Sequence, residues 1–294
     1  MNDRADLHTH TTASDGTNRP AHNVRLAAEA GLGAIAITDH DTVAGIAEAL
    51  AAGREAGVLV VPGVEISTVA GGKDIHILGY GIDYEDGMFI GRLLSLRDTR
   101  NRRNELILAR LAELGMPIAL EEVEAVAGKS STGGGSVGRP HIAQALVDRG
   151  FVSDIRDAFD RLLADGKPAH VNPPRIDPLT AIRWIHDAGG TAVVAHPGLY
   201  GADELVAEWL DGGADGIEAY HSDHDEEAER RYVRMAEERG KLITGGSDYH
   251  GLREGVFFHG PIGNRTVALS VAERLLGRRG GESGAGTRAE LSER

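Results

Sequence analysis

The chain has 294 residues, a formal net charge of −14 and an apolar fraction of 41%, with only 4% aromatic residues. This length suits one large α/β domain or one domain with an insertion, and the apolar fraction is sufficient for a buried core. The absence of cysteine excludes disulfides, thiolate zinc sites and cysteine nucleophiles. The negative charge argues against a broad surface for duplex DNA. No apolar run reaches the roughly 18 residues of a membrane span, and no signal peptide precedes Asp6, so we expect a cytoplasmic protein.

Strand and helix patterns alternate in the first third of the chain. We predict strands over residues 5–9, 32–38, 58–67 and 75–81 and helices over residues 18–30 and 42–56. Asn18 would cap the first of these helices, with Pro20 in its first turn. Between residues 93 and 170 the spacing of apolar residues predicts helices and no strand, with Ser153 as the cap of one of them.

The alternation returns in the last third of the chain. Helices are predicted over residues 178–188, 204–210 and 226–239, and strands over residues 191–195, 216–219 and 242–246. Such alternation favours parallel strands with crossover helices, in a barrel or in a doubly wound sheet.

Composition suggests how the chain divides. We expect residues 1–92 and 173–278 to form one α/β body that carries the functional residues, and residues 93–172 to form a helical insertion. The stretch from Ser130 to Ser136 contains three consecutive glycines and predicts a flexible loop inside the insertion. Residues 279–294 are rich in Gly, Ser, Glu and Arg, which predicts a disordered tail.

Histidine and carboxylate residues gather at the ends of the predicted strands. His8 and His10 are two residues apart in an apparent strand, so both imidazoles face one side, and Asp248 and His250 repeat this spacing. The other residues of this kind are Asp15, His40, Glu65, His76 and His196. A single strand-end histidine is more often structural than a ligand. Several strand ends with such residues, at the edge where functional groups gather in a parallel barrel, predict a metal site.

The segments that carry these residues resemble the ordered motifs of the PHP (polymerase and histidinol phosphatase) family. They are Asp6-Leu7-His8-Thr9-His10, Thr38-Asp39-His40-Asp41, Gly63-Val64-Glu65, His76-Ile77-Leu78-Gly79-Tyr80, Ala195-His196-Pro197 and Gly246-Ser247-Asp248-Tyr249-His250-Gly251. Residues 138–143 (GRPHIA) and 188–190 (AGG) also resemble the branch with nucleoside 3′,5′-bisphosphate phosphatases and a 5′→3′ exoribonuclease. The resemblance covers about residues 3–260 and implies a distorted (β/α)7-type barrel with a trinuclear metal site.

The resemblance also implies how the ligands divide among the metal positions. They would be His8, His10, Glu65 and Asp248 for the first, Asp15, His40 and His250 for the second, and Glu65, His76 and His196 for the third. We therefore expect two to three divalent ions per chain. Mn, Fe and Zn all suit a His/carboxylate site without sulfur.

Clustered divalent ions suit the hydrolysis of phosphate esters. Water that bridges two ions has a pKa of roughly 7, so a metal-bridging hydroxide is the expected nucleophile. His221 and His224 follow a predicted strand, and His221 is the candidate proton donor to the leaving group, whereas His224 is as well explained as a surface residue. For His22, His186 and His259 we expect structural or exposed positions. Asp39 and Asp41 flank His40, and either an imidazole-orienting role or, for Asp41, a helix-capping role fits.

Basic residues of the insertion are candidates for binding a second phosphate. Arg97, Arg100, Arg102 and Arg103 form a dense cluster, which on its own would more often be a solvated helix face. Arg139 and His141, in the segment that resembles the phosphatase branch, favour the binding role. The expected substrate contacts are Arg100, Arg103, Arg139, His141 and Lys167, although Lys167 also fits a simple turn. His170 stands where that branch has an aromatic residue, so the resemblance supplies no base-stacking side chain there.

Together these features predict a metal-dependent phosphoesterase that acts on small phosphorylated nucleotides, above all nucleoside 3′,5′-bisphosphates, or on short RNA 5′ ends. One alternative keeps the chemistry and changes the substrate to one like histidinol phosphate. A second is a non-catalytic nucleotide-binding or polymerase-accessory module, and a third is a metal-dependent hydrolase of C–N bonds. The arginines of the insertion disfavour the first, and the complete ligand set disfavours the second.

Overall fold

The computed structural model describes residues 2–130, 137–171, 174–253 and 255–277. The strands of its main sheet are β1 (Arg4–Asp6), β2 (Ala34–Ile37), β3 (Leu59–Ala70), β4 (Lys73–Tyr80), β5 (Thr191–Val194), β6 (Gly216–His221), β7 (Leu242–Gly246) and β10 (Val267–Ala268). They form one eight-stranded sheet in the order β10-β1-β2-β3-β4-β5-β6-β7. The Leu7 N–H donates to the Gly245 carbonyl at 3.1 Å, which joins the β1 side of the sheet to the β7 side. The sheet is therefore a nearly closed barrel.

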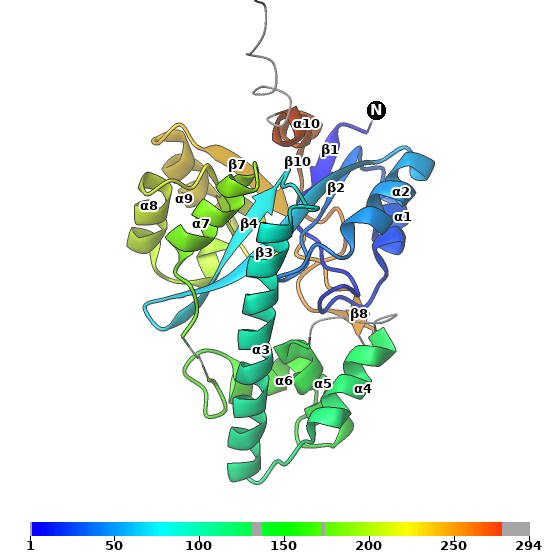
Figure 1. Ribbon diagram of the computed structural model, residues 1–294, viewed down its shortest axis with the longest axis vertical. Coiled ribbons are helices and arrows are strands. Elements are labelled where there is room, and N and C mark those ends of the chain that lie inside the picture. Colours follow the sequence, from blue (N-terminus) through cyan, green and yellow to red (C-terminus); the bar gives the residue numbers. More distant parts are fainter. Residues whose placement is uncertain (1, 131–136, 172–173, 254, 278–294) are drawn as a thin grey trace, which may run out of the picture.

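Helices cover the outside of this barrel, as the alternation in the sequence predicts. They are α1 (Pro20–Glu29), α2 (Ile46–Ala56), α7 (Pro178–Asp187), α8 (Asp203–Asp211), α9 (Glu226–Glu237) and α10 (Leu269–Gly277) (Figure 1). Strands that are buried on both faces need apolar runs, and every residue of β2 and β5 is buried. The predicted α/β barrel is thus confirmed.

Two strands of the main sheet depart from the expected parallel arrangement, β4 and the two-residue edge strand β10, which pairs antiparallel with β1. β4 pairs antiparallel with β3 and also with β5, while β1-β2-β3 and β5-β6-β7 are parallel runs. Strands β3 and β4 are joined by a tight turn at Gly71 and Gly72, both with positive φ, so no crossover helix intervenes. This hairpin is the distortion of the barrel.

Further helices lie at one end of the barrel. They are α3 (Gly87–Glu113), α4 (Leu120–Ser130), α5 (Arg139–Asp148), α6 (Ile155–Ala158) and the π-helical turn η1 (Phe159–Leu163). In Figure 1 the long α3 runs from beside the barrel into the group formed by α4, α5 and α6. Their buried residues, among them Ile107, Leu111, Ile142 and Leu163, form a hydrophobic cluster separate from those of the barrel. This separate core supports our proposal that residues 93–172 are an insertion domain.

Several local predictions can be compared with the structure. The first helix has Arg19, not Asn18, at its N-cap, because the Asn18 amide instead donates to the Tyr249 hydroxyl at 2.7 Å. Asp154, not Ser153, caps α6, since its side chain accepts from the Asp157 N–H at 2.8 Å. The predicted glycine loop at residues 131–136 and the predicted tail at residues 279–294 lie outside the described residues.

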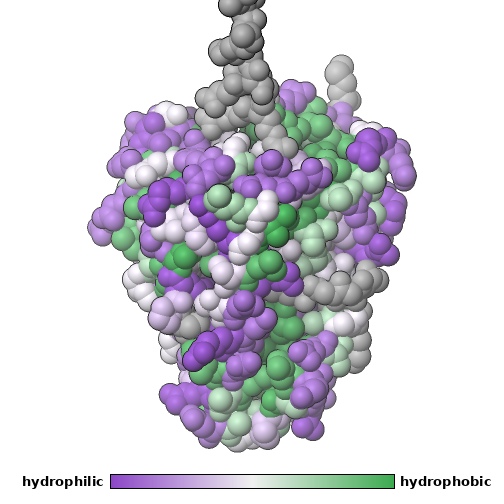
Figure 2. All heavy atoms as spheres, viewed as in Figure 1, coloured by the Kyte–Doolittle hydropathy of each residue, from purple (hydrophilic) through white to green (hydrophobic). Residues whose placement is uncertain are grey.

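The surface is mixed in character. Figure 2 shows hydrophobic atoms exposed between the hydrophilic residues of the insertion. Leu106 and Leu114 of this region are each 42% exposed. None of the helices in the described residues combines the length and the apolar character that a bilayer span needs.

The separate core of the insertion leads to a prediction. Leu111 is fully buried in that core, so Leu111→Ala should destabilise it by about 2–5 kcal/mol through lost contacts and a cavity. Hydrogen exchange should then accelerate in α4, α5 and the second half of α3, while the amides of β1–β7 keep their protection. Equal acceleration in the barrel would show that insertion and barrel form one cooperative unit.

Candidate metal centre

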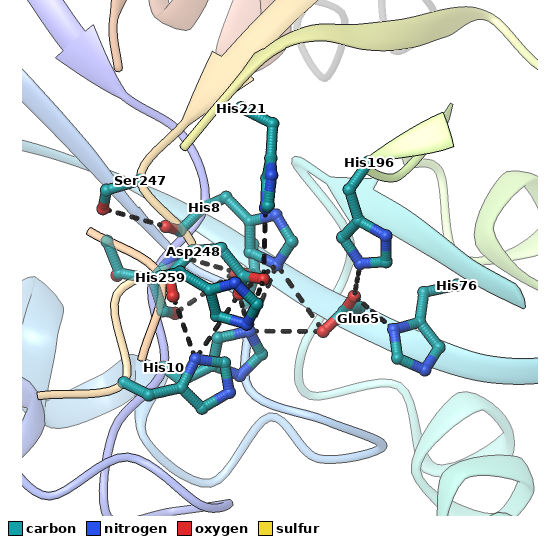
Figure 3. Close-up of polar contacts among 12 residues, drawn as sticks. His8, His10, Glu65, His76, His196, His221, Ser247, Asp248 and His259 are labelled. Atoms are coloured by element: carbon teal, nitrogen blue, oxygen red, sulfur yellow. Dashed lines mark hydrogen bonds and ion pairs between the residues drawn. The ribbon is translucent and has the colours of Figure 1, made fainter. Parts of the chain in front are cut away.

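One buried carboxylate lies at the centre of the site. Glu65, in β3, is 1% exposed and is surrounded by the imidazoles of His8, His10, His40, His76 and His196. Figure 3 shows its contacts with His8, His10, His76 and His196. Its Oε2 lies 3.5 Å from His8 Nε2, 3.2 Å from His10 Nε2 and 2.9 Å from His40 Nδ1. Its Oε1 lies 2.7 Å from His76 Nδ1 and 3.0 Å from His196 Nε2. The two oxygens therefore face two different groups of histidines.

The barrel brings these side chains together from distant parts of the chain. His8, His40 and His196 follow the carboxyl ends of β1, β2 and β5, as expected for a parallel barrel. Glu65 and His76, in contrast, lie within β3 and β4 and not at strand ends, which corrects the sequence-based expectation. The β3–β4 hairpin extends past the rim, and the bridge between His40 and Glu65 marks where it passes the neighbouring loop.

A second group lies beside the first. The ligand atoms of His10, Asp15, His40 and His250 all lie within 4.8 Å of one another, and all four residues are buried. Asp15 Oδ1 is 3.4 Å from His250 Nε2, and Asp15 Oδ2 is 3.8 Å from His40 Nε2. Asp248 joins the two groups, since its Oδ1 lies 3.3 Å from His8 Nε2 and 3.1 Å from His10 Nε2. The structure thus brings all nine predicted ligands into one cluster.

Backbone geometry at two of these residues is unusual. Asp248 has φ 53° and His196 has φ 22°, in the left-handed region that non-glycine residues rarely adopt. Strain of this kind persists where the surrounding structure over-determines it, commonly at functional sites. Just before Asp248, a Cβ at Gly246 would lie 2.4 Å from the His8 backbone nitrogen. Glycine is therefore required there for the ends of β1 and β7 to approach.

The protonation of these groups follows from burial and charge. Burial would raise the pKa of the Glu65 carboxyl, but the imidazoles of His40, His76 and His8 hold this pKa well below its usual range. Burial lowers the pKa of His40 to about 3 and that of His196 to about 4. At His10, burial is outweighed by Asp248 and Glu65, which raise its pKa to about 10. Metal binding needs neutral imidazoles and ionised carboxylates, so His10 would lose a proton when an ion binds.

The donor set fits divalent metal ions. Among the described residues, several buried ligand atoms form no hydrogen bond of suitable geometry, although some of them lie close to other ligand atoms; they are His10 Nδ1, His40 Nδ1, Glu65 Oε2, His76 Nδ1, His196 Nδ1 and Asp248 Oδ1. Buried polar atoms without partners are costly, and cations placed between these atoms would satisfy them. Imidazole nitrogen and carboxylate oxygen are the ligands that Mn, Fe and Zn accept. These residues can therefore hold metal ions.

Two residues of the site were not predicted from the sequence. Glu218 of β6 is fully buried, and its Oε1 lies 3.0 Å from His8 Nδ1, which orients the His8 ring. Its signal in the sequence is a single acidic residue inside an apolar strand. His259, expected to be structural or exposed, lines the cavity, with its Nε2 at 3.2 Å from Asp248 Oδ2 and its Nδ1 at 2.5 Å from Asp223 Oδ2.

His221, the candidate proton donor, has a different position from the one expected. It is fully buried and does not line the cavity. Its Nδ1 accepts from the Asp223 N–H at 3.1 Å, so its Nε2 carries the proton of the neutral ring and faces Asp248 Oδ2 at 3.2 Å. This geometry places His221 behind Asp248 and not beside a leaving group.

The two aspartates that flank His40 hold neighbouring segments in place, and within the described part of the chain neither has a hydrogen bond to an imidazole. Asp39 accepts from the Thr11 N–H and hydroxyl, each at 2.7 Å, which fixes the loop between His10 and Asp15. Asp41 accepts from the Ser67 N–H at 2.8 Å and from the Arg100 guanidinium at 2.9 Å, and it does not cap α2. Asp41 therefore neither orients an imidazole nor caps a helix, and instead links the barrel to the insertion through Arg100.

A cavity of about 240 Å³ opens over the cluster, and three predicted arginines line it. Arg100 pairs with Asp41, and Arg139 pairs with Asp74 at 2.6 Å. Arg103 is 4% exposed and forms no ion pair within the described residues, and its Nε has no hydrogen-bond partner there. Burial, followed by the charges of Arg139 and Arg100, lowers the pKa of Arg103 well below its usual value. A bound anion would compensate this buried cation.

Two other predicted substrate contacts do not line this cavity. His141 is fully buried, and its Nδ1 accepts from the Gly138 N–H at 3.0 Å, so it stabilises the start of α5. Lys167 is exposed in a turn, where its N–H donates to the Ala164 carbonyl at 3.0 Å. The position of Lys167 therefore agrees with the alternative of a simple turn and not with a contact to phosphate in this cavity.

Known proteins resemble this chain in sequence and in fold. The PHP domain profile matches residues 6–164. The 5′-3′ exoribonuclease Rnm of Escherichia coli strain K12 is 38% identical over 252 residues, which are 83% of this chain and 84% of that protein. The 3′,5′-nucleoside bisphosphate phosphatase of Chromobacterium violaceum is 33% identical over 255 residues, 85% and 88% of the two chains.

A solved structure extends the likeness to the whole fold. A protein from Bifidobacterium adolescentis, described as a metal-dependent phosphoesterase, superposes with a TM-score of 0.83 at 30% sequence identity. The superposition covers 93% of this chain and 96% of that one. This chain therefore belongs to the PHP domain family and is a metal-dependent phosphoesterase.

Proposed function

We propose that this phosphoesterase removes phosphate from small phosphorylated nucleotides, with nucleoside 3′,5′-bisphosphates or the 5′ ends of short RNAs as substrates. We also propose that the nine clustered residues bind two to three ions of Mn, Fe or Zn, and that the protein acts in the cytoplasm. The observation that carries the substrate proposal is the position of Arg103. This buried cation faces the same cavity as the metal-ligand cluster.

Charge balance favours an anionic substrate with more than one phosphate. The cluster has three carboxylates, Asp15, Glu65 and Asp248, while two divalent ions would bring four positive charges. When bound, these ions neutralise phosphoryl oxygens and lower the pKa of water. Arg103 then adds a further positive charge that no carboxylate of the described residues neutralises by an ion pair. A second phosphate on the substrate would neutralise it.

Arginine side chains of the insertion would position the phosphate groups of the substrate. Arg103 can form paired hydrogen bonds to a phosphate, because the guanidinium presents its donors in a fixed planar fork. Arg100 and Arg139 are held in place by Asp41 and Asp74, so they add positive potential to the cavity wall with little freedom to move. The names of the two curated relatives, a bisphosphate phosphatase and an exoribonuclease, agree with a substrate that has more than one phosphate.

Metal content is the first test. Protein purified without chelator should contain two to three divalent ions per chain, and removal of the ions should abolish phosphate release. Glu65→Gln should lower both the bound metal and kcat/KM, because a neutral amide compensates no charge at the oxygens that face both groups of histidines. Loss of an outer-shell partner of a ligand costs roughly 10–100-fold, so the effect at Glu65 should exceed about 100-fold. Elemental analysis and a phosphate-release assay measure both quantities.

The matched control for that test is Glu48→Gln. Glu48 lies on the surface in α2 and pairs with Arg19 at 2.9 Å, so its substitution should change neither metal content nor activity. Full activity of the Glu65→Gln protein with at most one ion per chain would contradict the multinuclear site.

Arg103→Ala tests the second phosphate. Loss of one charge-assisted contact is worth roughly 1.5–3 kcal/mol, so kcat/KM for a nucleoside 3′,5′-bisphosphate should fall about 10- to 150-fold. A simple aryl phosphate has no second phosphate, so its hydrolysis should change little. Steady-state kinetics with both substrates measures the difference.

Arg102→Ala is the control for this variant, since Arg102 is the exposed neighbour of Arg103 on α3. Arg100→Ala is less suitable, because it would also leave the buried Asp41 carboxylate without its cation. Equal losses on both substrates with Arg103→Ala would mean that Arg103 supports the fold or the ligands. No loss on either would refute its role in substrate binding.

A further inference from the structure

A second cavity adjoins the first. Its volume is about 450 Å³, and it lies between the start of α6 in the insertion and a hairpin formed by β8 (Leu252–Arg253) and β9 (Val256–Phe257). We call it the apolar groove, and its lining residues are Pro140, Asp154, Ile155, Arg156, His250, Val256, Phe257 and Phe258. Pro140, His250 and Phe258 also line the metal cavity, so the two spaces share a wall.

Part of the lining of the apolar groove consists of hydrophobic side chains that are exposed to solvent. Val256 is 67% exposed and Phe257 is 40% exposed, although both lie in a two-residue strand beside a strongly polar site. At the shared wall, the rings of Phe159 from η1 and Phe258 lie 5.2 Å apart, one from the insertion and one from the barrel side. Exposed apolar residues grouped at the entrance of a binding site commonly contact the ligand.

We propose that the apolar groove binds the nucleobase of the substrate whose phosphate lies in the metal cavity. This inference rests on the proposed function and specifies it, because it requires a nucleotide and not merely a phosphate ester. His250 lies in both walls, so whatever fills the apolar groove is next to, or covalently joined to, the group bound at the metal-ligand cluster. A base attached to a phosphorylated ribose meets that condition.

The side chains of the apolar groove fit a nucleobase better than they fit part of a sugar phosphate. A nucleobase has two apolar faces and a polar edge, and stacking on an aromatic ring is worth roughly 1–3 kcal/mol for any base. Phe257 and Phe258 provide aromatic rings, Ile155 and Val256 provide aliphatic surface, and Arg156 provides a guanidinium that can stack or donate. A sugar phosphate would leave the exposed Phe257 and Val256 in water.

This assignment also places the aromatic contact elsewhere than the resemblance to the family suggests. His170, which stands where an aromatic residue was expected, lines neither cavity, and its Nε2 lies 3.0 Å from Asp165 Oδ1. Phenylalanines of the β8–β9 hairpin and of the loop after it would take over that role in this chain.

Phe257→Ala tests the inference, because Phe257 lines the apolar groove and not the metal cavity. We expect kcat/KM for adenosine 3′,5′-bisphosphate to fall about 5- to 150-fold, mainly through KM. The analogue of this nucleotide that has a tetrahydrofuran ring without a base, and keeps both phosphates, should be hydrolysed by Phe257→Ala at the same rate as by the wild type. Leu252→Ala is the matched control, since Leu252 is a 50% exposed residue of the same hairpin that does not line the apolar groove.

A binding measurement provides a readout separate from turnover. A 2-aminopurine nucleoside bisphosphate should lose fluorescence when it binds the metal-loaded wild-type protein, because stacking quenches this base, and the loss should be smaller with Phe257→Ala. Equal kcat/KM of the wild type for the nucleotide and the base-free analogue would overturn the inference and leave the phosphoesterase intact. Equal losses on both substrates with Phe257→Ala would also overturn it. If the wild type hydrolysed neither bisphosphate, the proposed function would be refuted. Quenching of 2-aminopurine fluorescence would then still decide whether the apolar groove binds a base.

Discussion

The site depends on one buried carboxylate that is surrounded by imidazoles. Glu65 has His8, His10 and His40 around one oxygen and His76 and His196 around the other. An isolated carboxylate at this depth would be protonated, whereas these neighbours hold its pKa low and keep it ionised. Every one of these histidines comes from a different strand or strand end, apart from His8 and His10. The arrangement therefore depends on the pairing and curvature of the adjacent strands β1 to β5, which bring these side chains to one side of the barrel.

The distortion of the barrel has a direct consequence for this centre. In a regular parallel barrel all ligands would come from the loops that follow the strands. Here β3 and β4 form an antiparallel hairpin, so Glu65 and His76 reach the site from within strands, where they pair with Leu78 and Ser67. On their other sides, the Glu65 N–H donates to the Asp39 carbonyl and the Ala195 N–H donates to the His76 carbonyl, each at 3.2 Å. A residue whose two oxygens serve different groups of ligands needs such rigid support, because small displacements at a shared ligand disturb both groups.

The insertion and the barrel meet through charged pairs that also shape the cavity. Arg100 of α3 pairs with Asp41 after β2, and Arg139 of α5 pairs with Asp74 of β4, so two helices of the insertion are tied to two places on the barrel. Each of these arginines lines the cavity over the metal-ligand cluster. The insertion thus supplies both the positive potential above the site and, through α6, one wall of the apolar groove.

The sequence by itself predicted the alternation of strands and helices as far as β7, the family, and which residues gather at the centre, but not the elements β8, β9, β10 and α10 that follow. The spacing of two residues between His8 and His10 is a local pattern, and so is the recurrence of histidine and carboxylate residues near successive strands. Both can be recognised without knowledge of packing. Only the tertiary structure decided that Glu218 orients His8, that His259 lines the cavity while His221 lies behind Asp248, and that Arg103 is the buried arginine without an ion-pair partner in the described chain. The same holds for His141 and Lys167, which have the right residue types and lie away from the cavity. These differences depend on contacts between residues far apart in the chain, and residue type and local spacing contain no information about such contacts.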